Sequence, residues 1–316
     1  MRWMRPALFL VIQAAKRYRK KKNLPDHFEP LDDAWAEKAI REQDKWDQDC
    51  LTLDEKQKQG LNIEKAALPN CDAWMITSEK NPKDKVIYYI HGGGFTFGFT
   101  RGLIPKFFPY IVNKLGYNVF SIDYRLTPRY TCLDAVGDCE DGYRHLIQRF
   151  DPKKIVLMGD SAGGNLVLAL THKLIDDGLP VSGGIVSCSP VTQFLHYAYS
   201  YYECSCKTDY GIIFGINQVA DYYRGDLPLD HPYLSPLCGD FHGFPPTYLD
   251  ASDVESLRDD ARMVYVRLRE DGVDAEYHEL RDFFHAMLTR PHVGFVRREE
   301  YPHIRRFIER VFSGTD

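Results

Sequence analysis

The sequence has few features that would point to nucleic-acid or membrane-spanning proteins. Its basic residues form no long cluster outside the N-terminus, and its net charge is −5, so it lacks the positive patch expected of a nucleic-acid-binding protein. The apolar stretch near the N-terminus, Pro6–Ala15, is about ten residues long, whereas a membrane-spanning helix needs roughly 20. These shortages favour an ordinary globular protein that neither binds nucleic acid nor spans a membrane.

Cysteine is also sparse. Eight cysteines are spread irregularly over 316 residues, and no CxxC pair occurs. Cys204 and Cys206 form a C-x-C without a second pair to complete a zinc site. We therefore expect reduced thiols, no metal and a cytoplasmic location.

The N-terminus, residues 1–22, has the pattern of a basic amphipathic helix. Its positive charge follows the apolar stretch, and no small-residue cleavage site precedes Lys16, which argues against a secretion signal. Two hypotheses remain for this segment: it packs on its own protein, which we favour, or it makes peripheral contact with an acidic membrane surface. Its apolar side chains share one helical face: Met4, Leu8, Val11, Ile12 and Ala15.

From residue 86 onward, short apolar runs alternate with longer amphipathic stretches. This pattern predicts an α/β fold with a mostly parallel central sheet and helices on both faces. The expected strands are 86–90, 118–123, 155–158, 184–187, 247–250 and 276–279, and residues 63–67 and 73–77 should form an antiparallel pair. The expected helices are 34–50, 107–115, 135–149, 164–176 and 257–270.

One segment interrupts the alternation. Residues 194–232 follow a strand and are rich in tyrosine and phenylalanine. We interpret them as an insertion within a domain that spans residues 61–316, preceded by a separate N-terminal segment, residues 1–60.

The motif Gly159-Asp160-Ser161-Ala162-Gly163-Gly164 lies between a predicted strand and a predicted helix. G-x-S-x-G in that position is typical of a nucleophile elbow, a sharp turn that raises the serine hydroxyl above the sheet. A glycine-rich turn with an ordinary surface serine is the alternative. A nucleophilic serine needs a general base, and His285, which follows the last predicted strand, is the best placed of the eleven histidines.

The sequence His91-Gly92-Gly93-Gly94 follows another predicted strand. One glycine would suffice for a turn, so three in a row indicate a loop whose backbone must approach another atom closely.

Together these motifs resemble the hormone-sensitive lipase-like family of α/β-hydrolases, which contains many carboxylesterases. The resemblance covers about two thirds of the chain, in the order and spacing of the family. It is carried by HGGG (91–94), DYRLTP (123–128), GDSAGG (159–164), HPYLSPL (231–237), PPT (245–247), Glu255–Asp260 and His285. Thr127-Pro128-Arg129 departs from the usual Ala-Pro-Glu.

The resemblance implies a serine carboxylesterase that needs no cofactor. It implies an oxyanion hole formed by the backbone N–H groups of Gly93, Gly94 and Ala162, with His91 anchoring the loop. It also implies that the N-terminal segment and the insertion form a cap over the site.

The acid of the triad remains open between two carboxylates. Glu255 occupies the slot of the family's aspartate and lies thirty residues before His285. Asp253 lies nearer the strand end and has the more usual residue type. Either carboxylate could orient the histidine. We prefer Glu255 because of its slot and its spacing from His285.

Aromatic side chains near the predicted site suggest a pocket for short- to medium-chain acyl groups of a small-molecule ester. Phe95, Phe97, Phe194 and Tyr197 are the candidate substrate-binding residues, although packing of the insertion would also explain them. Alternative functions are an amidase or deacetylase with the same triad, a non-catalytic binding protein of this fold, and a lipase recruited to membranes by residues 1–22.

Overall fold

The structure is a computed structural model that describes residues 33–48, 60–195, 197–205 and 219–314. The predicted amphipathic segment, residues 1–22, and most of the predicted N-terminal segment lie outside the described residues. Among the helices that are described, none has the length and apolarity to cross a membrane.

Eight strands form one sheet, and its order is β1-β2-β4-β3-β5-β6-β7-β8. The neighbours β1–β2 and β2–β4 pair antiparallel, and the remaining neighbours pair parallel. All the predicted strands are confirmed, with small shifts at their ends. The strands are β1 (Asn62–Ala67), β2 (Asp72–Thr77), β3 (Val86–Ile90), β4 (Asn118–Ile122), β5 (Ile155–Asp160), β6 (Gly184–Cys188), β7 (Thr247–Ser252) and β8 (Ala275–Leu280).

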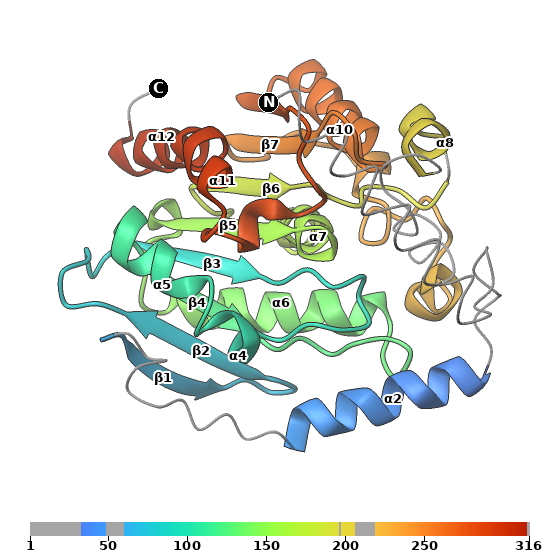
Figure 1. Cartoon of the computed structure of the whole chain (residues 1–316), viewed down its shortest axis with the longest axis horizontal. Coiled ribbons are helices and arrows are strands. Elements are labelled where there is room, and N and C mark those ends of the chain that lie inside the picture. The colour runs from blue at the N-terminus through green and yellow to red at the C-terminus, as the bar shows by residue number, and fades with distance from the viewer. Residues whose placement is uncertain (1–32, 49–59, 196, 206–218, 315–316) are drawn as a thin grey trace.

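Helices cover both faces of this sheet, as predicted (Figure 1). One face carries α6 (Cys132–Ile147), α7 (Ala162–Asp176) and α10 (Arg258–Glu270). The other carries α4 (Thr100–Leu103), α5 (Phe108–Tyr110), the π-helical turn η1 (Ile111–Leu115), α11 (Gly294–Glu299) and α12 (Tyr301–Ser313). Short 3₁₀ turns are η2 (Pro152–Lys154), η3 (Pro236–Cys238) and η4 (Met287–Thr289).

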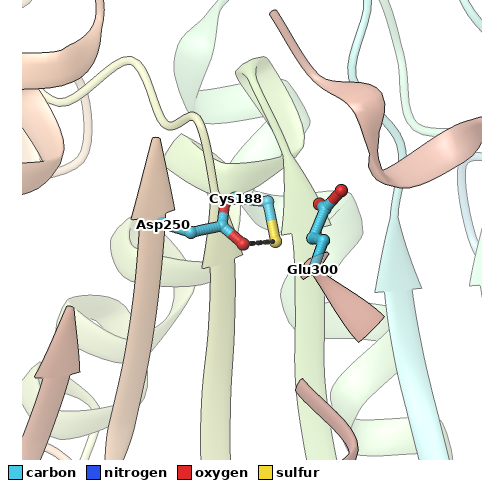
Figure 2. Close-up of side chains that lie close together, drawn as sticks. All are labelled: Cys188, Asp250 and Glu300. Atoms are coloured by element: carbon cyan, nitrogen blue, oxygen red, sulfur yellow. Dashed lines mark hydrogen bonds between the residues drawn. The ribbon is translucent and has the colours of Figure 1, made fainter. Parts of the chain in front are cut away.

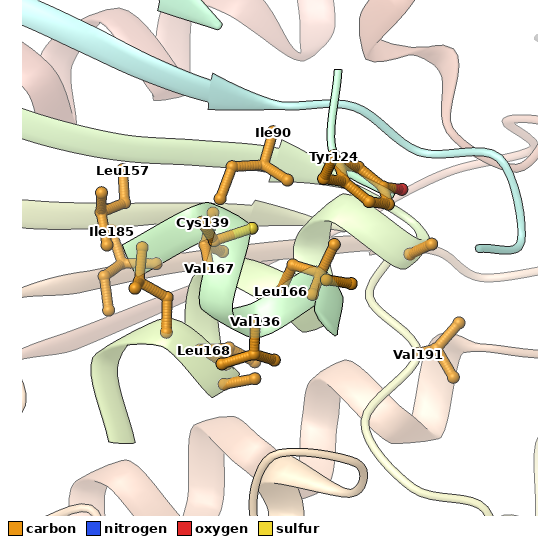
Figure 3. Close-up of a cluster of buried hydrophobic side chains, with 14 of the residues drawn as sticks. Ile90, Tyr124, Val136, Cys139, Leu157, Leu166, Val167, Leu168, Ile185 and Val191 are labelled. Atoms are coloured by element: carbon orange, nitrogen blue, oxygen red, sulfur yellow. The ribbon is translucent and has the colours of Figure 1, made fainter. Parts of the chain in front are cut away.

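The strands divide their side chains between two hydrophobic cores. In β3 all five residues are buried, and the neighbours Tyr88 and Tyr89 belong to different cores because successive side chains point to opposite faces. This explains why the central strands have continuous apolar runs instead of alternating ones. Figure 3 shows the first core, where Leu157 and Ile185 of the sheet lie beside Val167 of α7.

Helix α2 (Asp33–Gln48; Figure 1) contacts the insertion, the loop after β4 and the loop after β3. The rings of Trp35 and Tyr222 are 5.4 Å apart, and Tyr222 belongs to a helical segment, 219–224, of the predicted insertion. Arg129, the residue that departs from the family pattern, forms an ion pair of 2.8 Å with Asp44 of α2. Helix α8 (Tyr199–Ser205) is the other described helix of the insertion.

Two helical regions differ from the sequence prediction. The helix expected at 107–115 is divided into α5 and the π-helical turn η1, which ends at Gly116 in the left-handed conformation. Helices α11 and α12 were not predicted, although α12 presents Ile304, Phe307 and Ile308 to the second core at helical spacing. These helices cover the face of the sheet opposite α7.

Candidate active site

Ser161 lies in a strained turn between β5 and α7. Its φ is +55° and its ψ is −118°, a backbone conformation that residues other than glycine rarely adopt. The turn is tight because a Cβ on Gly159 would come within 2.4 Å of the Gly163 carbonyl oxygen. The predicted elbow geometry is therefore present, with the serine at the carboxyl edge of the sheet.

The structure places Ser161, His285 and Glu255 in one hydrogen-bonded series. Nε2 of His285 is 2.9 Å from Oγ of Ser161, and Nδ1 is 2.8 Å from Oε2 of Glu255. Glu255 is 1% exposed and Ser161 is 7% exposed. Each residue follows a different strand, so the fold brings them together at the carboxyl ends of β5, β7 and β8.

Asp253, the alternative acid, has a different partner. Its Oδ1 accepts the N–H of Asp282 at 2.7 Å. Asp282 starts the loop that carries His285, and Ser252 Oγ accepts the next N–H, that of Phe283, at 3.1 Å. Asp253 therefore fastens the loop of the histidine, whereas Glu255 contacts its imidazole.

Two donors hold the second oxygen of Glu255. Oε1 accepts the Oγ–H of Ser189 at 2.8 Å and the N–H of Ser252 at 2.7 Å. Ser189 was not identified from the sequence. The available signal was its position, directly after the strand that neighbours the Ser161 strand.

The glycine loop passes directly against the elbow. A Cβ on Gly163 would lie 2.0 Å from the carbonyl oxygen of Ile90, so the two backbones touch. Gly93 has φ +130° and Gly94 has φ +58°, and a Cβ on Gly93 would lie 1.8 Å from the Phe97 carbonyl oxygen. The contact at Gly163 therefore joins the end of β3, from which the glycine loop starts, to the first turn of α7, which begins at Ala162.

Asp160 links the glycine loop to the elbow through its side chain. Its Oδ1 accepts the Gly92 N–H at 3.2 Å and the hydroxyl of Tyr89. Burial raises the pKa of the Asp160 carboxyl, and the Tyr89 hydrogen bond opposes that rise. The residue before the serine therefore joins the two predicted motifs.

His91 anchors the start of the loop in the manner expected. Its Nδ1 donates to the Gly92 carbonyl at 2.9 Å, and its ring stacks on Tyr124 with centroids 4.3 Å apart. Burial lowers the pKa of His91.

The predicted substrate-binding aromatics fall into two groups. Phe95 and Phe194 are buried and both pack on Tyr223 of the insertion, with ring centroids 4.0 and 6.4 Å away. Phe97 and Tyr197 are 54% and 74% exposed. The buried pair therefore forms packing contacts with Tyr223. A contact of any of the four aromatic residues with substrate stays a prediction.

One buried cluster combines metal-ligating residue types. Figure 2 shows Cys188, Asp250 and Glu300, whose ligand atoms all lie within 4.8 Å of one another. The Cys188 thiol donates to Asp250 Oδ2 at 3.4 Å. Burial raises the pKa of Asp250 to about 7 and the pKa of Glu300 well above its usual range, so protons can neutralise both carboxylates without a cation. The expectation of no metal remains a prediction.

Comparison with known proteins agrees with this geometry. Residues 87–289 match the family model described as the α/β-hydrolase fold. The chain is 32% identical over 237 residues to esterase LipU of Mycobacterium tuberculosis, a match that covers 66% of this chain and 74% of the relative. It is 27% identical over 206 residues to an acetyl-hydrolase of Streptomyces hygroscopicus, covering 64% and 67%.

Solved structures give a similar result. An esterase from the bacterial hormone-sensitive lipase family is 26% identical and superposes with a TM-score of 0.76, covering 98% of this chain and 97% of the other. The esterase EstE5, studied after soaking with p-nitrophenyl butyrate, is 25% identical with a TM-score of 0.76, covering 96% and 97%. The chain therefore belongs to the α/β-hydrolase fold family, within its hormone-sensitive lipase-like esterases.

Proposed function

We propose that this protein hydrolyses carboxylic esters of short- to medium-chain acids through an acyl-enzyme on Ser161. The observation that carries the proposal is the series of hydrogen bonds from Ser161 Oγ through His285 to Glu255. A serine hydroxyl becomes a useful nucleophile when a histidine accepts its proton and a carboxylate stabilises the resulting imidazolium. The geometry offers both groups within hydrogen-bonding distance.

In the acylation step, Nε2 of His285 takes the proton of Ser161 as Oγ attacks the ester carbonyl. The C–O bond to the alcohol breaks when the tetrahedral intermediate collapses, and His285 returns the proton to the departing alcohol. Glu255 accepts the Nδ1–H throughout and stabilises the imidazolium. The products of this step are the free alcohol and the acyl-serine ester.

In the second step, water replaces the alcohol. His285 removes a proton from water, the resulting hydroxide equivalent attacks the acyl carbon, and the Ser161 oxygen leaves with that proton. The carboxylic acid is released and the enzyme is regenerated. The proposed chemistry uses side chains and backbone amides alone.

The oxyanion formed in each step needs donors that are already in place. We assign this role to the backbone N–H groups of Gly93, Gly94 and Ala162. Support comes from the backbone contact between Gly163 and Ile90, which fixes the loop against the elbow, and from the positive φ of both glycines. Donors fixed before the reaction stabilise developing charge without reorganisation.

The proposed cap combines the N-terminal segment with the insertion at residues 194–232. Its support is the contact of Trp35 in α2 with Tyr222, together with the packing of Phe95, next to the glycine loop, on Tyr223.

Hydrolysis of p-nitrophenyl acetate, butyrate and octanoate by wild type and Ser161→Ala tests the proposal. We expect turnover by wild type, best on the shorter esters, and a loss of several orders of magnitude in the variant. Wild-type activity no greater than that of the variant would support the non-catalytic binding protein instead. Faster cleavage of p-nitroacetanilide than of the acetate ester would indicate an amidase.

We also propose a cytoplasmic location for the protein and packing of residues 1–22 on its own fold, with peripheral contact with an anionic membrane surface as the alternative. The support is the sequence of that segment, in which basic residues follow an apolar helical face. Co-sedimentation of the intact protein with anionic vesicles at low salt, lost when residues 1–22 are deleted, would support the alternative. Failure of the intact protein to co-sediment with such vesicles would exclude it.

A further inference from the structure

Ser189 contacts the proposed acid, Glu255, and the loop that carries the base, His285. It belongs to none of the motifs that predicted the site. It follows β6 directly and has φ +46°, the left-handed region that residues other than glycine seldom occupy. It is 5% exposed. Strained conformations of this kind persist when the surroundings hold them in place, and they concentrate at functional sites.

The backbone around Ser189 is fixed from two sides. Its N–H donates to the Asp250 carbonyl on β7 at 2.8 Å. The carbonyl of the preceding residue, Cys188, accepts the Ser161 N–H at 2.9 Å. The position of the Ser189 hydroxyl is therefore tied both to the elbow and to the strand that precedes Glu255.

The Ser189 hydroxyl has two partners: the carboxylate of Glu255 and the backbone of the residue next to His285. It donates to Oε1 of Glu255 at 2.8 Å, and it accepts the N–H of Ala286, the residue after His285, at 3.5 Å. With Oε1 held in this way, the other oxygen of the same carboxylate, Oε2, faces Nδ1 of His285.

A glutamate needs such a restraint more than an aspartate does. Its longer side chain has an additional rotatable bond, so a free glutamate carboxylate would sample more positions around the imidazole. The other donor to Oε1 is the backbone N–H of Ser252, which lies only three residues away on the same segment. Ser189, which follows β6, is the donor that fixes the Glu255 carboxylate to a different strand from its own.

We propose that Ser189 is a positioning residue that acts through Glu255 to orient His285 for proton transfer with Ser161. The inference rests on the proposed esterase function. It predicts that removal of the Ser189 hydroxyl slows the chemical step while substrate binding is preserved.

The test compares kcat and KM for p-nitrophenyl butyrate in wild type, Ser189→Ala and Ser187→Ala. Ser187 is the matched control because it is a buried serine of β6, two residues before Ser189, and its hydroxyl donates to the Gly164 carbonyl at 2.9 Å instead of to Glu255. We expect Ser189→Ala to lower kcat about 10- to 100-fold, the range for loss of a hydrogen bond to a charged group, with KM changed less than about twofold. Ser187→Ala should remain within about threefold of wild type.

A double-mutant cycle separates positioning from a general structural effect. If Ser189 acts through Glu255, then Ser189→Ala should cost no further activity in a Glu255→Ala background. The same loss in both backgrounds, or equal kcat for Ser189→Ala and Ser187→Ala, would overturn the inference.

Ser189→Gly controls for the backbone, because it removes the hydroxyl and tolerates the positive φ. It should lose as much activity as Ser189→Ala, and it serves as the test variant if the alanine protein does not fold. Recovery of wild-type kcat in Ser189→Gly would attribute the effect to strain and refute positioning. If wild type itself is no faster than Ser161→Ala, the proposed function fails, which is a different outcome from wild-type activity with an unaffected Ser189→Ala.

Discussion

Nε2 of Gln43, in helix α2, donates to the main-chain carbonyl of Thr127 at 2.8 Å and to that of Thr96 at 3.0 Å. These two carbonyls belong to the loop after β4 and to the glycine loop, respectively. A single amide thus joins the N-terminal helix to both loops. The Thr96 carbonyl lies two residues beyond Gly94, so the docking of α2 bears on the proposed oxyanion hole.

Gln43→Ala should therefore weaken the docking of α2. The substitution leaves two carbonyl oxygens without this donor, which costs about 1–3 kcal/mol in comparable buried sites. Thermal unfolding should show a lower midpoint than wild type. Glu42→Ala is the control, since Glu42 is partly exposed and forms a surface ion pair with Lys45, and it should leave the midpoint unchanged. Equal midpoints for the two variants would contradict the role of Gln43.

Amide substitutions should distinguish the two candidate acids. Glu255→Gln removes the charge beside Nδ1 of His285 and should lower kcat by about 10⁴, as in other triads that lose the carboxylate but keep its shape. Asp253→Asn retains an oxygen that can accept the Asp282 N–H and should stay within about tenfold of wild type. Steady-state kinetics of the two proteins decide the matter, and the reverse order of losses would assign the acid to Asp253.

The two glycines of the loop should respond differently to alanine. At Gly93 the new Cβ would collide with the Phe97 carbonyl, so Gly93→Ala should displace the loop and lower kcat by about 10²–10³. At Gly94 the space is open, and the left-handed φ alone costs about 1–2 kcal/mol. Gly94→Ala should lose less than tenfold in kcat if folded protein is assayed. A loss below tenfold for Gly93→Ala would mean that the clash is relieved without moving the donors.

Asp250 should make the stability of the protein fall as pH rises. Its pKa is raised by burial from 3.8 to about 7 in the folded state, so the folded state holds a proton that the unfolded state releases. Between about pH 4 and pH 7 the unfolded state binds fewer protons, and the free energy of unfolding therefore decreases with pH. Below about pH 4 Asp250 is protonated in both states, so its titration no longer changes the free energy of unfolding.

Asp250→Asn removes this titration, so its unfolding midpoint should decline less between pH 5 and pH 8 than that of wild type. The exposed Asp230→Asn serves as the control and should follow wild type. Parallel curves for wild type and Asp250→Asn would show that Asp250 does not hold the proton.

Much of the fold was predictable because local patterns and global packing agree. Continuous apolar runs such as Val86–Ile90 indicated strands covered on both faces, and the structure shows them covered. The place of His285 after the last strand followed from the same pattern, since loops at the carboxyl edge of a parallel sheet meet one another. Helix α12 was missed although its apolar spacing and Pro302 near its start were available signals.

The contacts that hold the site were not predictable from the sequence. Ser189 lies 66 residues from Glu255, and nothing local to either residue indicates their hydrogen bond. The cluster of Cys188, Asp250 and Glu300 is equally non-local, because it depends on how the chain between α11 and α12 packs against β6 and β7. Contacts between side chains that only tertiary packing brings together produce no periodic pattern in the sequence.

The backbone contact between Gly163 and Ile90 has a consequence for how this scaffold can vary. This contact is made by main-chain atoms and requires that residue 163 carry no side chain, and the hydrogen bond from the Gly92 N–H to Asp160 is the side-chain contact that supports the same spacing. The insertion and α2 reach the site through side-chain contacts, such as those of Tyr223 and Gln43. In the proposed cap, changes in α2 and residues 194–232 should therefore alter which substrates are accepted while the reacting groups keep their mutual placement, so these segments are the targets we propose for redesigning specificity.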